Sequence, residues 1–142
     1  MLRLLFAMTF PVIVGSVELS AQNCKITVSG LRNDKGQVTM YVFDNAIGFP
    51  EERERASQVV SETISNKESV FVLQVTPGDY AVTFLHDENL DGEMQYSWIG
   101  MPTEGFGFSN DPRVKLSAPS FDACRFRVTK DGCALTVKAK YF

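Results

Sequence analysis

The sequence is poor in the residues on which many catalytic sites depend. It has three cysteines without a CxxC pair, and a single histidine, His86, among 142 residues. A lone histidine cannot supply a pair of imidazole ligands for a transition metal, and neither a nucleophile motif nor a Ser-His-Asp arrangement accompanies it. The sequence also lacks an internal repeat and a long amphipathic helical pattern. We therefore expect a protein that is not an enzyme.

Positive charge is scarce as well. Lys and Arg number 14 against 17 Asp and Glu, so the formal net charge is -3 at pH 7. Such a chain has no electrostatic footprint for nucleic acid or for an anionic membrane surface. Hydrophobic residues make up 44% of the chain and include eleven Phe, which is enough for a core that does not depend on disulfides.

The N-terminus has the three-part layout of a secretory signal peptide. A positive charge at Arg3 precedes an apolar run, and small residues end at Ala21. This predicts a signal peptide over residues 1–21 and a single domain over residues 22–142, secreted or periplasmic, with no membrane span after cleavage. An uncleaved anchor helix is the alternative, whereas Cys24 comes too late for a lipoprotein. The partner stays unknown, and a cell-envelope component is one option.

The expected domain keeps three cysteines: Cys24, Cys124 and Cys133. Export would place them in an oxidising compartment, so one disulfide is expected. Cys124 and Cys133 lie on either side of an expected turn, while Cys24 begins the first expected strand. All three pairings stay open, and each leaves one thiol.

Short strands dominate the rest of the pattern. Several segments alternate apolar and polar residues, and Gly, Pro, Asn and Asp separate them. The expected strands are 25–29, 37–43, 59–64, 69–75, 80–85, 125–128 and 135–141. This is typical of an all-β, antiparallel β-sandwich of about seven strands, immunoglobulin-like or prealbumin-like, with one long ordered loop.

Turn residues predict which strands are neighbours. Segments 33–36, 76–79 and 130–132 are rich in tight-turn formers, and each lies between two expected strands. We therefore expect three hairpins, the last of which closes the chain. Residues 45–57 break the pattern and are expected to form a surface loop with one helical turn.

The loop 86–110 is the expected functional segment. Asp87, Asn89 and Asp91 place side-chain oxygens at alternate positions ahead of Gly92. Loops present oxygen ligands to calcium in this manner. The same residues are also the commonest turn formers, and Asx turns need no metal.

Both interpretations of this spacing stay open. The EF-hand pattern fails because Trp98 occupies the position of the final bidentate carboxylate. A calcium loop on a β scaffold would instead use Asp87, Asn89, Asp91 and Glu93, with Glu88 or Glu104 completing the shell. Ca²⁺ is thus the one cofactor that the residues suggest, and the alternative is a loop held by its own hydrogen bonds.

Six further residues are expected to structure the loop or to bind a ligand: His86, Trp98, Glu104, Phe106, Phe108 and Asn110. His86 ends an expected strand, and we expect it to bond the loop to the sheet. The aromatic residues, together with Phe121, either form a platform for a sugar ring or pack against one another.

Several motifs occur together in order. They are Pro77-Gly78-Asp79-Tyr80-Ala81-Val82, His86-Asp87-Glu88-Asn89 with Asp91-Gly92, the run Gly-Met-Pro-Thr-Glu-Gly-Phe-Gly-Phe-Ser-Asn over 100–110, and Pro119-Ser120-Phe121-Asp122-Ala123. Over the span from Cys24 to Phe142 the chain resembles the bacterial domain-of-unknown-function family 2141. The resemblance implies a secreted or periplasmic β-sandwich without an assigned activity. Gln95 departs from the family pattern, which often has a carboxylate there, and this implies weaker cation binding.

We favour an exported, non-catalytic binding or structural module whose long loop is pinned by hydrogen bonds, with or without Ca²⁺. One alternative is a hydrolase of envelope polymers, in which His86 is the base and Asp87 or Glu104 its partner; a His86 buried against backbone would remove it. The other is a carbohydrate-binding module that uses Trp98 and the loop phenylalanines. That module would need at least two of these rings exposed on one surface.

Overall fold

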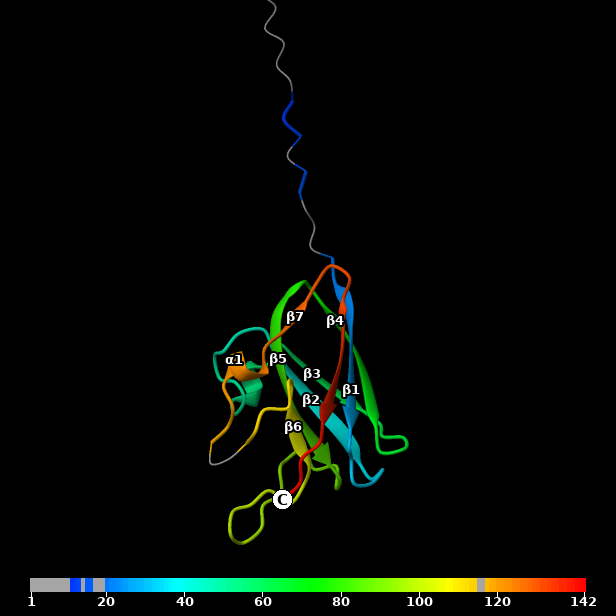
Figure 1. The fold of residues 1–142 in the computed structure, drawn as a ribbon, viewed down its shortest axis with the longest axis vertical. Coiled ribbons are helices and arrows are strands. Elements are labelled where there is room, and N and C mark those ends of the chain that lie inside the picture. Colours follow the sequence, from blue (N-terminus) through cyan, green and yellow to red (C-terminus); the bar gives the residue numbers. More distant parts are fainter. Residues whose placement is uncertain (1–10, 14, 17–19, 115–116) are drawn as a thin grey trace, which may run out of the picture.

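Two packed β-sheets form the domain in a computed structural model that describes residues 11–13, 15–16, 20–114 and 117–142 (Figure 1). The smaller sheet has the strand order β4-β1-β8, and the larger has the order β3-β2-β5-β6, with β7 also paired to β5. The strands are β1 (Gln22–Ser29), β2 (Gln37–Phe43), β3 (Gln58–Glu62), β4 (Ser69–Val75), β5 (Gly78–Asp87), β6 (Phe106–Phe108), β7 (Phe126–Val128) and β8 (Cys133–Lys138). A 3-10 turn, η1 (Arg53–Arg55), and a short helix, α1 (Phe121–Cys124), complete the elements. The predicted all-β sandwich is confirmed.

The main core lies between the two sheets. Strand β4 alternates strictly between buried and exposed residues, with Phe71 and Leu73 pointing inward. They pack with Ile26 of β1 and with Met40 and Phe84 of the larger sheet. The period-two pattern read from the sequence therefore marks the inward face of the smaller sheet.

Strands β2 and β5 of the larger sheet are buried on both faces. Phe106 and Phe108 form a second core with Ala81 and Cys124. Phe49, from the loop that contains η1, packs against this second core. The long loop therefore connects two buried strands of the larger sheet, β5 and β6.

The three predicted hairpins are wrong. Each of the pairs β1/β2, β4/β5 and β7/β8 flanks a predicted turn, but in each pair one strand belongs to the smaller sheet and the other pairs within the larger sheet. Strand β7 pairs with β5, and β8 pairs with β1 in parallel. A turn sequence specifies the reversal of the chain, but burial of the two apolar faces against each other carries the next strand into the opposite sheet.

The parallel pairing of β1 with β8 places Cys24 opposite Cys133, and the two form a disulfide. This bond joins positions 109 residues apart. The expectation of a disulfide is confirmed, and of the three open pairings the structure has this one. Cys124, in α1, is the cysteine that stays outside the disulfide, and it is fully buried.

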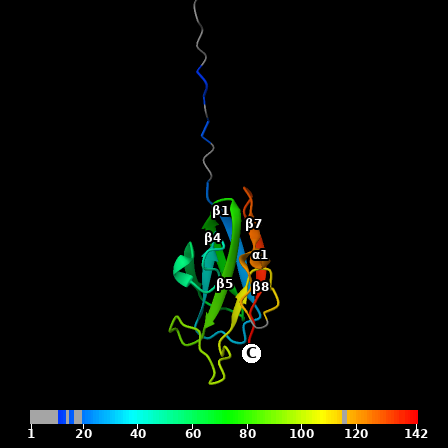
Figure 2. The ribbon, with the colours of Figure 1, turned by 90° about the vertical axis from the view of Figure 1, so that its left-hand side faces the viewer.

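Most of the predicted signal peptide falls on residues 1–10, 14 and 17–19, which lie outside the described residues. Strand β1 begins at Gln22, the residue after the predicted cleavage site. Among the described residues, no helix has the length and apolar character needed to cross a membrane. At the other end of the sandwich, the loop that follows β5 projects beyond the sheets in both views (Figures 1 and 2).

Candidate metal site

The site begins where strand β5 ends. Asp87 is its last residue and is fully buried. One carboxylate oxygen of Asp87 accepts the backbone N–H of Asp91 at 3.1 Å, and the other accepts the N–H of Gly92 at 2.8 Å. Asp87 therefore holds the first turn of the long loop. Leu90 and Gly92 have φ values of 60° and 76° there, and glycine adopts the second without strain.

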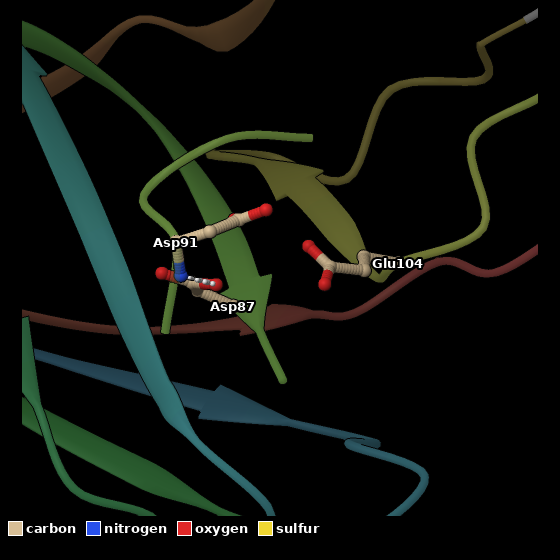
Figure 3. A group of neighbouring side chains, drawn as sticks. All are labelled: Asp87, Asp91 and Glu104. Atoms are coloured by element: carbon tan, nitrogen blue, oxygen red, sulfur yellow. Dashed lines mark hydrogen bonds between the residues drawn. The ribbon is translucent and has the colours of Figure 1, made fainter. Parts of the chain in front are cut away.

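Three carboxylates converge on this turn. Asp87, Asp91 and Glu104 each contribute one oxygen to a group in which all three atoms lie within 4.8 Å of one another (Figure 3). Antiparallel pairing of β6 with β5 carries Glu104 to this place, since Gly105 accepts the backbone N–H of His86 at 2.8 Å. Asp91 is exposed, whereas the other two carboxylates are buried.

Glu104 has an oxygen without a partner. The residue is 5% exposed, and its buried Oε2 accepts no hydrogen bond from any residue of the described ranges. Burial, together with the negative charges of Asp87 and Asp91, raises the pKa of Glu104 above its ordinary value. A buried acceptor without a donor destabilises a fold unless a cation or proton satisfies it. The carboxylate points toward the other two (Figure 3).

Asn89 and Glu93 donate hydrogen bonds that stabilise the turn around Asp91. The Asn89 amide donates to Asp91 Oδ2 at 3.1 Å, and the backbone N–H of Glu93 donates to Asp91 Oδ1 at 2.9 Å. This backbone bond is the largest cause of a lowered pKa at Asp91. Two of the four predicted ligands thus gather with Glu104, whereas Glu93 lies outside the gathered carboxylates.

His86 connects β5 to two other segments. Its ring is fully buried, and Nε2 donates to the Lys35 carbonyl at 2.8 Å because a carbonyl only accepts. Nδ1 therefore accepts from the Tyr141 hydroxyl at 2.7 Å. Both ring nitrogens are hydrogen-bonded and the ring is enclosed, so His86 has no free nitrogen to act as the base that a hydrolase would need.

An ion pair closes the same end of the loop. Arg32 contacts Glu88 at 2.5 Å, donates to the Thr103 carbonyl at 2.9 Å and lies over the Tyr141 ring at 4.8 Å. Burial opposes ionisation of Glu88, but hydrogen bonds from Asn33 and Arg32 hold its pKa below the ordinary value. Arg32 and Tyr141 were not identified from the sequence, where they lie far from the loop and carry no motif.

The end of the loop is fixed by packing. Phe106 and Phe108 belong to the second core. A Cβ added at Gly105 or at Gly107 would meet the ring of Tyr141 or of Phe84, respectively, which explains the glycines that alternate with these aromatic residues.

Asn110 fixes the chain just after the aromatic residues. It has a φ of 65° and donates to the Arg125 carbonyl at 2.8 Å. Among the aromatic residues considered for a sugar platform, Trp98 is exposed whereas Phe106 and Phe108 are buried.

A comparison with family models agrees with the resemblance seen in the motifs. The matching model is described as an uncharacterized protein conserved in bacteria, and it covers residues 26–135. Neither the curated proteins nor the solved structures gave a match. The match spans most of the domain, including both sheets and the three clustered carboxylates. The chain belongs to the bacterial domain-of-unknown-function family 2141.

Proposed function

We propose that the protein is an exported, non-catalytic binding or structural module whose long loop is held in shape by Ca²⁺ bound to Asp87, Asp91 and Glu104. The observation that carries the proposal is the unpartnered Oε2 of Glu104, buried beside two further carboxylates. Three ionised carboxylates so close together repel one another. A divalent cation bound between them attracts all three and offsets this repulsion.

The number of carboxylates, with oxygens close enough to share one ion, favours calcium among the hard cations. Calcium binds oxygen at 2.3–2.6 Å, so two of its ligands can lie up to about 5 Å apart. The three oxygens here lie within 4.8 Å of one another, which satisfies that limit. Magnesium requires distances of about 2.0–2.1 Å in a near-ideal octahedron, and it usually keeps several waters and binds only one or two carboxylates, so a group of three carboxylates suits calcium better. The exposure of Asp91 leaves room for water to complete the shell.

An exported location is consistent with the disulfide and with the proposed calcium site. The Cys24–Cys133 disulfide is typical of an oxidising compartment outside the cytoplasm. The start of β1 at Gln22 agrees with cleavage after Ala21, since processing there would leave the whole strand intact. Calcium sites of extracellular modules typically have dissociation constants of about 0.1–1 mM. A site of that strength suits a protein outside the cell.

The direct test is thermal unfolding of the exported protein with millimolar CaCl₂ and with chelator. A ligand that binds only the folded state raises the melting temperature, and at ten times Kd the gain is about 1.4 kcal/mol. Glu104→Gln should abolish this gain. Glu93→Gln is the matched control because Glu93 lies outside the gathered carboxylates, and it should retain the gain.

Two results would contradict the proposal. One is an equal melting temperature in calcium and in chelator. The other is a calcium effect that survives Glu104→Gln but disappears in Glu93→Gln, which would assign the cation to the ligand set predicted from the sequence.

A further inference from the structure

The tip of the long loop, residues 94–103, exposes large apolar side chains. The chain reverses between Ser97 and Gly100, whose N–H donates to the Ser97 carbonyl at 2.9 Å. Trp98 and Ile99 are therefore the outermost residues of the turn, and they are 97% and 63% exposed. Tyr96 is exposed beside them. Exposed apolar groups gathered on a projecting loop are typical of a contact surface.

The tip carries no ionisable acid or base apart from the Tyr96 phenol. No Asp, Glu, Lys, Arg or His occurs between Glu93 and Glu104, although charged residues make up 22% of the chain. Transfer of a charged side chain into lipid costs several kcal/mol, whereas Trp and Tyr favour the membrane interface. The composition therefore fits a lipid surface.

Several backbone groups of the tip form hydrogen bonds within the tip. Besides the Ser97–Gly100 bond, the N–H of Ser97 donates to Met101 at 2.8 Å and that of Thr103 donates to Gln95 at 2.8 Å. The N–H of Met101 donates to the Ser97 hydroxyl at 3.3 Å. Backbone groups that enter an apolar layer must be paired within the protein, because each unpaired group costs several kcal/mol there. The hydrogen bonds of the tip meet that requirement for the N–H groups of Ser97, Gly100, Met101 and Thr103.

We propose that the exposed side chains of the tip, those of Tyr96, Trp98, Ile99 and Met101, insert into the interfacial layer of an anionic phospholipid membrane when calcium occupies the carboxylate site. The tip is a convex projection (Figures 1 and 2), which a soft lipid layer accommodates without a preformed complementary pocket. The apolar residues supply the driving force, in place of basic residues, which the tip lacks.

The calcium dependence rests on the proposed function. Asp87, Asp91 and Glu104 lie at the base of the loop and, when ionised, repel an anionic surface, as does the net charge of -3. A bound divalent cation offsets two of those charges. Because Asp91 is exposed, the cation can also accept phosphate oxygens in place of water.

Trp98 is the only tryptophan, so its fluorescence reports on the tip alone. The full gene is expressed with its own leader, and the exported protein is collected and its N-terminus determined by mass spectrometry. Emission is then recorded with vesicles of phosphatidylglycerol and phosphatidylcholine, in calcium and in chelator. We expect a blue shift, and quenching by brominated lipid, in calcium but not in chelator.

Ile99→Ser tests the insertion while keeping the reporter. Burial of one large aliphatic side chain is worth at least a factor of about ten in affinity, so this variant should bind vesicles about tenfold more weakly. Val72→Ser is the matched control, because Val72 is similarly exposed, at 58%, but lies on β4. Its binding should be unchanged.

Three outcomes would overturn the inference. They are the absence of a shift with vesicles in calcium, an equal shift in chelator, and a shift that grows with protein concentration without vesicles, which would indicate self-association. Calcium binding is followed separately, by the melting temperature without lipid. A calcium-dependent melting temperature with no vesicle effect would overturn the membrane inference and leave the calcium site standing.

Discussion

The hydroxyl of Tyr141 donates to Nδ1 of His86 at 2.7 Å, and so ties the C-terminal segment to the end of β5. The same oxygen accepts the backbone N–H of Arg32 at 3.1 Å. One phenol thus joins three segments that are distant in sequence. His86 precedes Asp87 directly, so this contact also fixes the residue that begins the carboxylate cluster.

Tyr141→Phe is therefore expected to destabilise the domain. It removes the donor to Nδ1 of His86 and the acceptor for Arg32, and groups left unpaired in this way cost about 1–3 kcal/mol. Chemical denaturation of the variant measures the loss. Tyr96→Phe, on the exposed tip, is the control and should leave stability unchanged. Equal stability of Tyr141→Phe and wild type would mean that the contact contributes nothing.

The disulfide between Cys24 and Cys133 is expected to be a major source of stability. It closes a long segment, and loss of a native disulfide from a small exported domain typically costs about 2–5 kcal/mol. The double variant Cys24→Ser with Cys133→Ser should show this loss in a denaturant titration. Mass mapping of the oxidised wild type should recover the 24–133 link, and a link that involves Cys124 would contradict the structure.

Cys124 should be unreactive in the folded protein. Burial raises the pKa of its thiol to about 11, from a reference value of 9.0. At pH 8 the thiolate is then scarce and enclosed, so a thiol reagent should label Cys124 only after unfolding. Rapid labelling under native conditions would show that the second core opens readily.

The same pKa shift predicts a pH effect with a definite sign. The folded state favours the protonated thiol, so this stabilisation is complete below pH 9 and is lost as the pH rises through about 11. Cys124→Ala lacks the titrating group. Its free energy of unfolding should therefore fall less than that of wild type between pH 8 and pH 11. A parallel fall in both proteins would contradict the assignment.

Seven of the eight described strands and most of the long loop were predictable because their signals are local, but β6 lies within the segment that was expected to be loop. Alternation with a period of two and clusters of turn residues are properties of short segments. The pairing of strands was not predictable in this way. A turn such as 76–79 permits either a hairpin or a crossing between sheets, and the choice depends on long-range burial that no short window contains.

The candidate site was also predictable only where its residues are close in sequence. Asp87 and Asp91 were found from their spacing, since they belong to one turn. Glu104 joins them because β6 pairs beside β5, and Arg32 and Tyr141 reach the loop only through the tertiary fold. Trp98 was considered as part of an aromatic platform, but its neighbours Phe106 and Phe108 are buried. Spacing identified the residues of one turn, and strand pairing determined which others joined them.

A calorimetric titration of the protein with CaCl₂ tests the central claim most directly. The account predicts one bound Ca²⁺ per chain, with binding lost in Glu104→Gln and retained in Glu93→Gln. Circular dichroism of each variant in chelator confirms that it is folded before the comparison. No binding heat at millimolar calcium, together with no change in melting temperature, would contradict the claim.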